Sequence, residues 1–267
     1  MNIILISALI IAAIAVVAAV VLYVVSQKFK VYEDPRIDEV AALLPGANCG
    51  GCGLPGCRNF AENVVKAGGL KGKTCPAGGV SVNSAIAEMF GEGVGEVVPQ
   101  KVVVRCNGSC EHAPAKVHYD SIPSCAYFHM TYAGESGCAY GCLGCGDCVT
   151  VCKFDAIAID GETKLPKVNN NCVLCGACVT ACPRTILAIV PVSEEGTVVV
   201  GCMNKEKGVD AKKNCKIACI GCKKCEKTCE FGAITVENNL ATIDYEKCKV
   251  CKKCIEGCPA KNICVVV

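Results

Sequence analysis

Cysteine is the residue whose number and spacing point to chemistry in this chain. There are 27 cysteines among 267 residues, and many of them fall in tight C-x2-C-x2-C runs. At this density a small secreted protein would be expected to form a disulfide scaffold. Cysteines separated by only two residues, however, cannot bridge each other without strain. The runs therefore favour thiolate ligands of metal over disulfides.

The densest runs suit iron–sulfur clusters. A [4Fe–4S] cluster takes four thiolates, of which a C-x2-C-x2-C loop supplies three, and a cysteine four positions later can reach a neighbouring cluster. This pattern occurs in four runs, which begin at Cys142, Cys172, Cys219 and Cys248. The runs resemble those of bacterial two-cluster ferredoxins, in which the last cysteine of each run crosses to the other cluster. The resemblance implies four clusters, held by Cys142, Cys145, Cys148 and Cys182; by Cys172, Cys175, Cys178 and Cys152; by Cys219, Cys222, Cys225 and Cys258; and by Cys248, Cys251, Cys254 and Cys229.

The second pair of runs is an internal repeat of the first. Its cysteines follow 76 or 77 residues later, and the valines at 102–104 are echoed by those at 198–200. Two copies of one structural unit are the economical explanation. Within each copy, short apolar segments flank a turn at Asp160-Gly161 or at Asn238-Asn239, which predicts one β-hairpin per copy.

Two features qualify the ferredoxin resemblance. Lys153 and Glu230 stand where the first run of each pair usually continues with proline, so cluster potentials cannot be transferred from ferredoxins. Structural zinc is the competing interpretation, because C-x2-C pairs also bind zinc. Zinc sites use paired C-x2-C knuckles, however, whereas each run here has four overlapping cysteines and is followed by another of the same kind.

A separate cysteine module precedes the repeat, with the spacing C-x2-C-x4-C-x17-C. The segment 58–69 predicts a helix that returns the chain to the fourth cysteine. The module resembles the small iron–sulfur domain shared by the B subunit of Rnf complexes and some corrinoid iron–sulfur proteins. It is expected to hold one [4Fe–4S] cluster through Cys49, Cys52, Cys57 and Cys75.

Four further cysteines lie between this module and the repeat at irregular spacing. We predict that they hold another [4Fe–4S] cluster, because free thiols at such density would be liable to oxidation. The total is then six clusters on 24 cysteines, and Cys202, Cys215 and Cys264 have no assigned role. The four irregularly spaced cysteines are Cys106, Cys110, Cys125 and Cys138.

The N-terminal segment predicts a membrane anchor. Ile3–Val25 has no charge and is rich in Ile, Val, Leu and Ala, and 23 helical residues span roughly 34 Å. A cleaved signal peptide would begin with a basic region, which is absent here. Because Lys28 and Lys30 follow the span, the positive-inside rule places the N-terminus outside and the bulk of the chain in the cytoplasm.

These elements predict an α+β protein with one transmembrane helix, a small helical iron–sulfur domain and two ferredoxin-like units with short hairpins. The expected organisation is an anchor (1–27), a connector (28–44), the four-cysteine domain (45–79), a linker (80–100), the irregular cysteine region (101–138), and the two ferredoxin modules (139–192 and 193–267).

The order of these parts resembles the B subunit of the Rnf complex over nearly the whole chain. The resemblance implies a subunit of an ion-translocating ferredoxin:NAD oxidoreductase that accepts electrons from soluble ferredoxin and relays them to other membrane subunits. It implies no catalytic residue in this chain, and no acid, base or nucleophile constellation is found. The competing interpretation is a membrane-anchored polyferredoxin that serves a hydrogenase or a formate-oxidising complex.

Charge is unevenly distributed along the chain. Residues 31–200 hold 12 basic and 17 acidic side chains, whereas residues 201–267 hold 13 lysines and 8 acidic side chains. Two-cluster ferredoxins are typically acidic, so the basic last third is a candidate docking surface. The absence of tryptophan and the few aromatic residues argue against nucleic-acid binding. The candidate docking lysines are Lys205, Lys207, Lys212, Lys213, Lys223, Lys224, Lys252 and Lys253.

Overall fold

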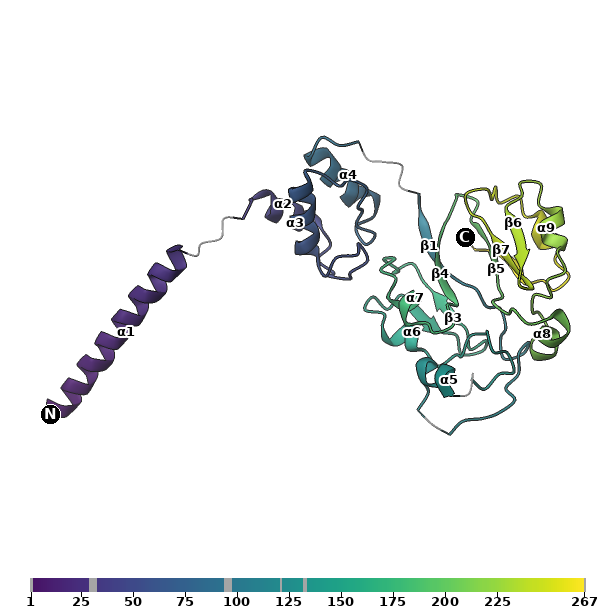
Figure 1. The fold of residues 1–267 in the computed structure, drawn as a ribbon, viewed down its shortest axis with the longest axis horizontal. Coiled ribbons are helices and arrows are strands. Elements are labelled where there is room, and N and C mark those ends of the chain that lie inside the picture. Colours follow the sequence, from purple (N-terminus) through teal and green to yellow (C-terminus); the bar gives the residue numbers. More distant parts are fainter. Residues whose placement is uncertain (1, 29–32, 94–97, 121, 132–133, 267) are drawn as a thin grey trace.

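The computed structural model describes residues 2–28, 33–93, 98–120, 122–131 and 134–266. A long N-terminal helix is followed by a three-helix domain and then by two units of short helices and strands (Figure 1). The α+β class expected from the sequence is confirmed.

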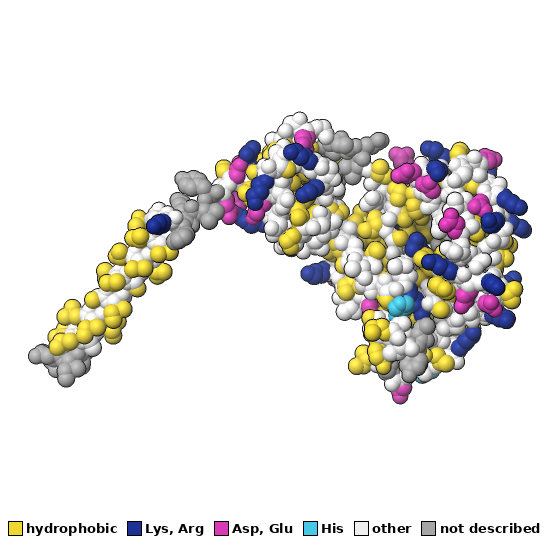
Figure 2. All heavy atoms as spheres, in the orientation of Figure 1, with side chains coloured by type: hydrophobic (Ala, Val, Ile, Leu, Met, Phe, Trp, Pro, Cys, Tyr) yellow, Lys and Arg dark blue, Asp and Glu magenta, His cyan; other side chains and the backbone are white. Residues whose placement is uncertain are grey.

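The N-terminal helix α1 (Asn2–Lys28) has the properties of a membrane anchor. Within it, Leu5–Lys28 has a mean hydropathy of 3.1, and none of its described side chains is buried against the rest of the chain. Figure 2 shows hydrophobic side chains along the coloured part of the visible face of this helix. At about 1.5 Å per residue, its 27 residues reach about 40 Å, which is enough to cross a bilayer. Lys30 lies outside the described residues.

The three-helix domain has its own core. Helices α2 (Arg36–Leu43), α3 (Cys57–Ala67) and α4 (Gly79–Met89) contribute Val40, Phe60, Val64 and Ile86, each at most 1% exposed. The predicted returning helix is therefore α3. The expectation that 80–100 is a linker is wrong for its first half, because α4 packs into this core. Likewise α2, expected in the connector, belongs to the domain.

The two remaining units repeat one arrangement of elements. Each has an outer two-stranded antiparallel sheet, made by the first and last strands of the unit, and an inner hairpin. In the first unit β1 (Gln100–Val104) pairs with β4 (Leu187–Pro191), and β2 (Ile157–Ile159) pairs with β3 (Pro166–Val168). In the second, β5 (Thr197–Val200) pairs with β8 (Ile263–Val266), and β6 (Ile234–Glu237) pairs with β7 (Leu240–Ile243).

Both predicted hairpins are thus confirmed, and so is the repeat. The turn of the second hairpin has Asn238 and Asn239 at φ +48° and +61°, the left-handed conformation that a two-residue hairpin turn requires. Short helices lie between the strands of each unit: α5 (Cys125–Thr131), α6 (Asp147–Thr150) and α7 (Ala177–Ala181) in the first, and α8 (Gly208–Asn214), α9 (Lys224–Thr228) and α10 (Lys253–Glu256) in the second.

The outer sheets of the two units share a small core. Val103 of β1, Val190 of β4 and Val199 of β5 are at most 4% exposed and lie in one cluster. Strand β1 therefore belongs to the first ferredoxin unit, although the sequence placed it in a separate irregular region at 101–138. The reason is its pairing with β4, some 80 residues later, which no local pattern indicates.

Candidate iron–sulfur cluster sites

The N-terminal domain brings its four cysteines to one cavity, lined by Cys49, Cys52, Cys57 and Cys75 together with Phe60. Cys57 opens α3, and its backbone N–H donates to Oδ1 of Asn48 at 2.9 Å. Cys75 is buried, and burial raises the pKa of its thiol. The four residues thus have the convergence and the soft donor set that a cubane requires.

Asn83 of α4 holds the fourth cysteine in place. Its Oδ1 accepts the backbone N–H of Cys75 at 2.8 Å, and its Nδ2 donates to the carbonyls of Cys75 at 2.9 Å and Gly79 at 2.6 Å. Asn83 is 1% exposed, so these bonds have no competition from water. No sequence pattern indicated this role, because the residue lies in the segment predicted as a linker.

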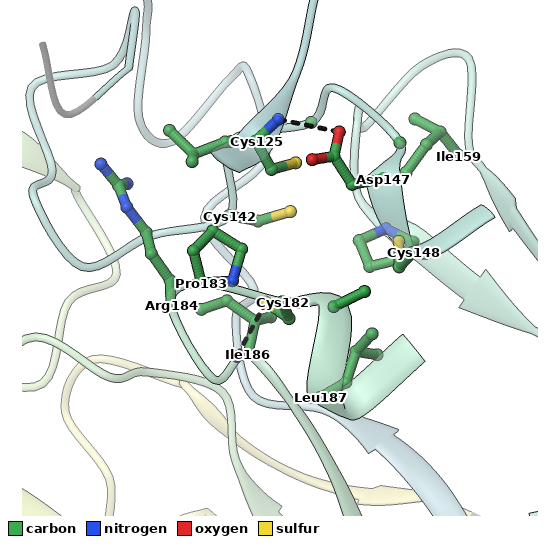
Figure 3. Close-up of a pocket in the computed structure, with 15 residues that line it drawn as sticks. Cys125, Cys142, Asp147, Cys148, Ile159, Cys182, Pro183, Arg184, Ile186 and Leu187 are labelled. Atoms are coloured by element: carbon green, nitrogen blue, oxygen red, sulfur yellow. Dashed lines mark hydrogen bonds between the residues drawn. The ribbon is translucent and has the colours of Figure 1, made fainter. Parts of the chain in front are cut away.

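The first site of the first unit contains five cysteines. Cys142, Cys148 and Cys182 line one cavity, as expected, but Cys125 lines it too (Figure 3). Cys125 also forms a side-chain hydrogen bond with Cys145, the remaining expected ligand.

Asp147 holds Cys125 at the first site of the first unit. Its carboxylate accepts the backbone N–H groups of Cys125 at 2.8 Å and Ala126 at 3.0 Å, and the hydroxyl of Ser124 at 3.1 Å. The N–H groups of Cys125 and Ala126 lie at the start of α5 and have no acceptor within the helix, so a carboxylate caps them well. The cap fixes the first turn of α5 beside the cysteine run that begins at Cys142.

The second site of the first unit brings Cys152 together with the run that begins at Cys172. Cys152, Cys172 and Cys178 pack in one cluster of apolar side chains. Burial raises the pKa of Cys178, and the neighbouring thiols of Cys172 and Cys175 add to the rise. Cys152 therefore lies beside the second run, the position that a crossing fourth ligand would need.

The second unit has the same two arrangements. Cys229, Cys248, Cys251 and Cys254 line one cavity. Burial raises the pKa of Cys225 to about 11, with contributions from Cys219, Cys222 and Cys258, so these four thiols lie near one another.

Backbone N–H groups point at the crossing cysteines. Ala156 donates to Sγ of Cys152, Ile186 to Cys182 and Ala233 to Cys229, each at 3.4 Å and each from four residues further along the chain. Hydrogen bonds to cluster sulfurs raise reduction potential and fix the ligand. In the fourth equivalent position, Sγ of Cys258 instead lies 3.6 Å from Oδ1 of Asn262.

The irregular cysteines do not form one group, so that prediction is wrong. Cys110 is exposed and its thiol lies 3.6 Å from the carbonyl of Thr163, while Cys125 lies at the first site of the first unit. Cys106 and Cys138 are buried together in a different cavity, whose lining includes Cys202 and Cys215. The chain between β1 and α6 winds past several sites, so cysteines close in sequence there separate in space.

Cys264 lies in β8 opposite Val199, and its sulfur faces the core between the outer sheets. Among the described residues, no three His, Cys, Asp or Glu side chains are grouped closely enough to hold a single metal ion. A cubane spreads its ligands over four iron atoms, and so its four thiolates lie farther apart than those around one zinc ion.

Three family models match the cysteine-containing segments. An Fe-S cluster family covers residues 44–76, a 4Fe-4S dicluster domain covers 141–186, and a 4Fe-4S binding domain covers 218–232. These segments coincide with the N-terminal cavity, with both sites of the first unit and with the first run of the second unit.

Similar proteins cover nearly the whole chain. The B subunit of a sodium-translocating ferredoxin:NAD(+) oxidoreductase complex from Acetobacterium woodii is 46% identical over 91% of this chain and 72% of the relative. The B subunit of an ion-translocating oxidoreductase complex from Methanosarcina acetivorans is 42% identical over 91% of each chain. A proton-translocating counterpart from Clostridium ljungdahlii is 36% identical over 100% of this chain and 94% of the relative.

These relatives favour the oxidoreductase complex over the alternative of a polyferredoxin for a hydrogenase. Together with the candidate membrane helix and the matched 4Fe-4S segments, they identify an electron-transfer component of such a complex. The chain belongs to the family of B subunits of ion-translocating (Rnf-type) oxidoreductase complexes and is a membrane-associated, iron–sulfur electron-transfer subunit.

Proposed function

We propose that this subunit accepts single electrons from soluble ferredoxin at its second ferredoxin unit and passes them, through six [4Fe–4S] clusters, to membrane partner subunits. Bound clusters would supply the one-electron carriers, and the chain supplies their ligands, spacing and electrostatics. The observation that carries the proposal is a pair of lysines beside exposed cysteines of the second unit.

Cys222 and Cys251 are exposed, and each is followed directly by a lysine. Lys223 and Lys252 have φ of +59° and +64°, whereas the equivalent positions of the first unit, Gly146 and Gly176, are glycines. A left-handed conformation costs a non-glycine residue roughly 1–2 kcal/mol. Strain of this kind tends to be kept where it serves a function.

The wider surface has the charge that an acidic donor would meet. All eight lysines proposed from the sequence are exposed, and Figure 2 shows Lys and Arg side chains along the outer edge of the second unit. Opposite charge steers a weak and rapid encounter, which suits electron transfer between separate proteins. An electron that enters at this surface would first reach the clusters held by the exposed thiols of Cys222 and Cys251.

The other end of the relay is the N-terminal domain, next to the anchor. A Cβ atom added to Gly51, between two cysteines of the N-terminal site, would lie 3.0 Å from Cα of Cys175. The cysteine loops of this domain and of the first unit therefore touch. Close contact between loops that carry ligands favours transfer between their clusters.

The docking proposal is tested by Lys223→Gly together with Lys252→Gly. Glycine relieves the left-handed strain, so stability should stay equal or rise while two charges are lost. The rate of ferredoxin oxidation by the purified complex should fall about tenfold at low ionic strength and converge on the wild-type rate as salt is added. Stopped-flow absorbance over a range of salt concentrations measures both effects.

Lys164→Gly is the matched control. Lys164 is also exposed and has φ +57°, but it lies in the hairpin loop of the first unit. It should gain the same relief of strain per residue, and lose one charge, without slowing the reaction. Equal rates for the double variant and the wild type at low ionic strength would overturn the docking proposal, as would equal slowing by the control.

We also propose that the N-terminus lies outside and both ferredoxin units lie in the cytoplasm, because Lys28 closes the apolar helix. A protease-sensitive tag placed before Asn2 should be cut in intact cells, and a tag placed after the C-terminus should be cut only after lysis. The reverse pattern would contradict the orientation without affecting the docking test.

A further inference from the structure

Four buried cysteines meet where the two ferredoxin units join. Cys106 and Cys138 come from the first unit, Cys202 and Cys215 from the second, and all four are 6–9% exposed. They line one cavity, which we call the seam site, and the two pairs occupy equivalent positions in the repeat. Neither the ferredoxin pattern nor the matched family segments assign these residues.

We propose that Cys106, Cys138, Cys202 and Cys215 ligate a [4Fe–4S] cluster at this seam. Each thiol is a soft ligand, their number is the one that a cubane needs, and each unit contributes half. The cluster replaces the one predicted from the irregular cysteines, so the expected total stays at six while two of its ligands change.

Glycine lines the seam site at two points where the backbone lies close to the sulfurs. A Cβ atom added to Gly108 would lie 3.3 Å from Sγ of Cys215, and one added to Gly141 would lie 3.4 Å from Sγ of Cys138. Much of the remaining lining is apolar, including Ala113 and Ala218. Glycine at these two points lets the backbone approach the sulfurs closely, as it does around a bound cluster.

Backbone and side-chain N–H groups donate hydrogen bonds to the sulfurs of the seam site. The N–H of Cys142 donates to Sγ of Cys106 at 3.4 Å, and the N–H of Cys219 donates to Sγ of Cys202 at 3.3 Å. Asn204 adds its backbone N–H to Cys202 at 3.5 Å and its side-chain amide to Cys138 at 3.6 Å. Such N–H groups stabilise thiolates and tune the potential of a bound cluster.

Burial shields these thiols from solvent. It raises the pKa of Cys202 to about 12 and also raises the pKa values of Cys106 and Cys215. Four thiols so placed have no role in packing that alanine or valine could not fill. Metal coordination, which deprotonates cysteine, accounts for their convergence.

Two of these backbone N–H donors also indicate which clusters the seam cluster would connect. Cys142 and Cys219 are the first ligands expected for the first cluster of each unit, and each donates its N–H to a seam cysteine. An electron arriving from the second unit would reach the seam and leave to the first unit, with no bond formed or broken and no proton moved. This direction rests on the proposed ferredoxin donor, whereas the existence of the cluster does not.

The test is a count of iron and acid-labile sulfide in the anaerobically purified chain. Cys202→Ala and Cys215→Ala should each lower both counts from about 24 to about 20 per chain. Cys110→Ala and Cys264→Ala are matched controls and should leave both counts unchanged. Native mass spectrometry should show six clusters in the wild type and the controls, and five in the seam variants.

Two further measurements keep the test decisive if an alanine variant folds poorly. Cys215→Ser retains an oxygen ligand, so it should alter the EPR signal and potential of one cluster and leave the other five unchanged. Unaltered EPR signals in this variant, loss of a cluster in Cys110→Ala, or one equivalent of zinc in the wild type would each overturn the seam cluster. None of these outcomes depends on ferredoxin kinetics, so the docking proposal is tested separately.

Discussion

Asn83→Leu is expected to remove the N-terminal cluster while leaving the ferredoxin units intact. The side chain satisfies the N–H and the carbonyl of Cys75 and the carbonyl of Gly79, at 2.6–2.9 Å, and it is 1% exposed. Leucine has a similar volume but no polar atom, so three backbone groups would lose their partner. Each buried, unsatisfied group costs roughly 1–3 kcal/mol.

The total, on the order of 3–9 kcal/mol, is comparable to the whole stability of a small domain. Cys75 would no longer be held at the N-terminal site, and iron should fall by about four atoms per chain. Electron transfer to the membrane partners should fall with it, whereas ferredoxin should still reduce the remaining clusters in a single-turnover experiment. Iron analysis and rapid-mixing spectroscopy separate these two effects.

Asn63→Leu is the matched control in the same domain. Asn63 lies on α3, and its amide donates to the carbonyl of Asn59 within that helix at 2.9 Å, close to solvent. Loss of this bond exposes no buried group, so cluster content should be unchanged. Retention of a full iron count by Asn83→Leu would contradict the role assigned to Asn83.

The ferredoxin-like cysteine runs could be recognised because their spacing is local. Three predicted ligands of each cluster lie within seven residues, and the expected crossing cysteine follows at a fixed spacing. The hairpins were predictable for the same reason, since Asn238 and Asn239 specify the turn between two short apolar segments. The helix α3 and the anchor α1 follow from composition over a single stretch of chain.

What escaped prediction depends on contacts between distant segments. Asn83 lies in a helix that was predicted to be part of a linker, because glycines follow it at 91, 93 and 95. The meeting of Cys106 with Cys202 depends on how two complete units pack, which no spacing rule expresses. One signal was present in the sequence: the repeat keeps equivalents of Cys106 and Cys138 but has none for Cys110 and Cys125. The positions kept in both copies are those whose cysteines line the seam site.

Arg184→Gln is expected to lower the reduction potential of the clusters nearest the seam. Arg184 follows Cys182 and Pro183 in the chain (Figure 3). Its Nη1 donates to the carbonyls of Gly141 at 2.6 Å and Cys138 at 3.1 Å. It is 7% exposed and interacts electrostatically with the thiols of Cys106, Cys138 and Cys142. A fixed positive charge there favours the reduced, more negative state of a cluster.

The size of the shift follows from Coulomb's law. Two unit charges about 10 Å apart interact by roughly 1.7 kcal/mol at an effective dielectric constant of about 20. For one electron this corresponds to on the order of 70 mV. Burial lowers the pKa of Arg184, but the ordinary value is so high that the guanidinium keeps its charge. Redox titration monitored by EPR should therefore show a downward shift of tens of millivolts in one or two clusters.

Arg184→Lys and Arg58→Gln separate charge from other effects. The lysine variant retains the charge and should recover most of the potential, although it lacks the two-pronged geometry that binds both carbonyls. Arg58 is exposed and pairs with Glu33 and Asp38 in the N-terminal domain, so its loss should leave the same clusters unshifted. An unchanged or raised potential in Arg184→Gln would show that the guanidinium does not act on the clusters.

The positive charge of Arg184 is also expected to favour electron transfer from the second unit to the first. The repeat places Ala260 of the second unit in the position of Arg184, so at this position only the first unit has a cation, and it is buried. The lysines of the second unit are exposed, and solvent and salt screen their effect on potential. The first unit should therefore hold electrons more tightly than the second, which favours movement from the lysine surface through the seam. Arg184→Gln should reduce that difference and slow transfer to the N-terminal domain without slowing the initial reduction by ferredoxin.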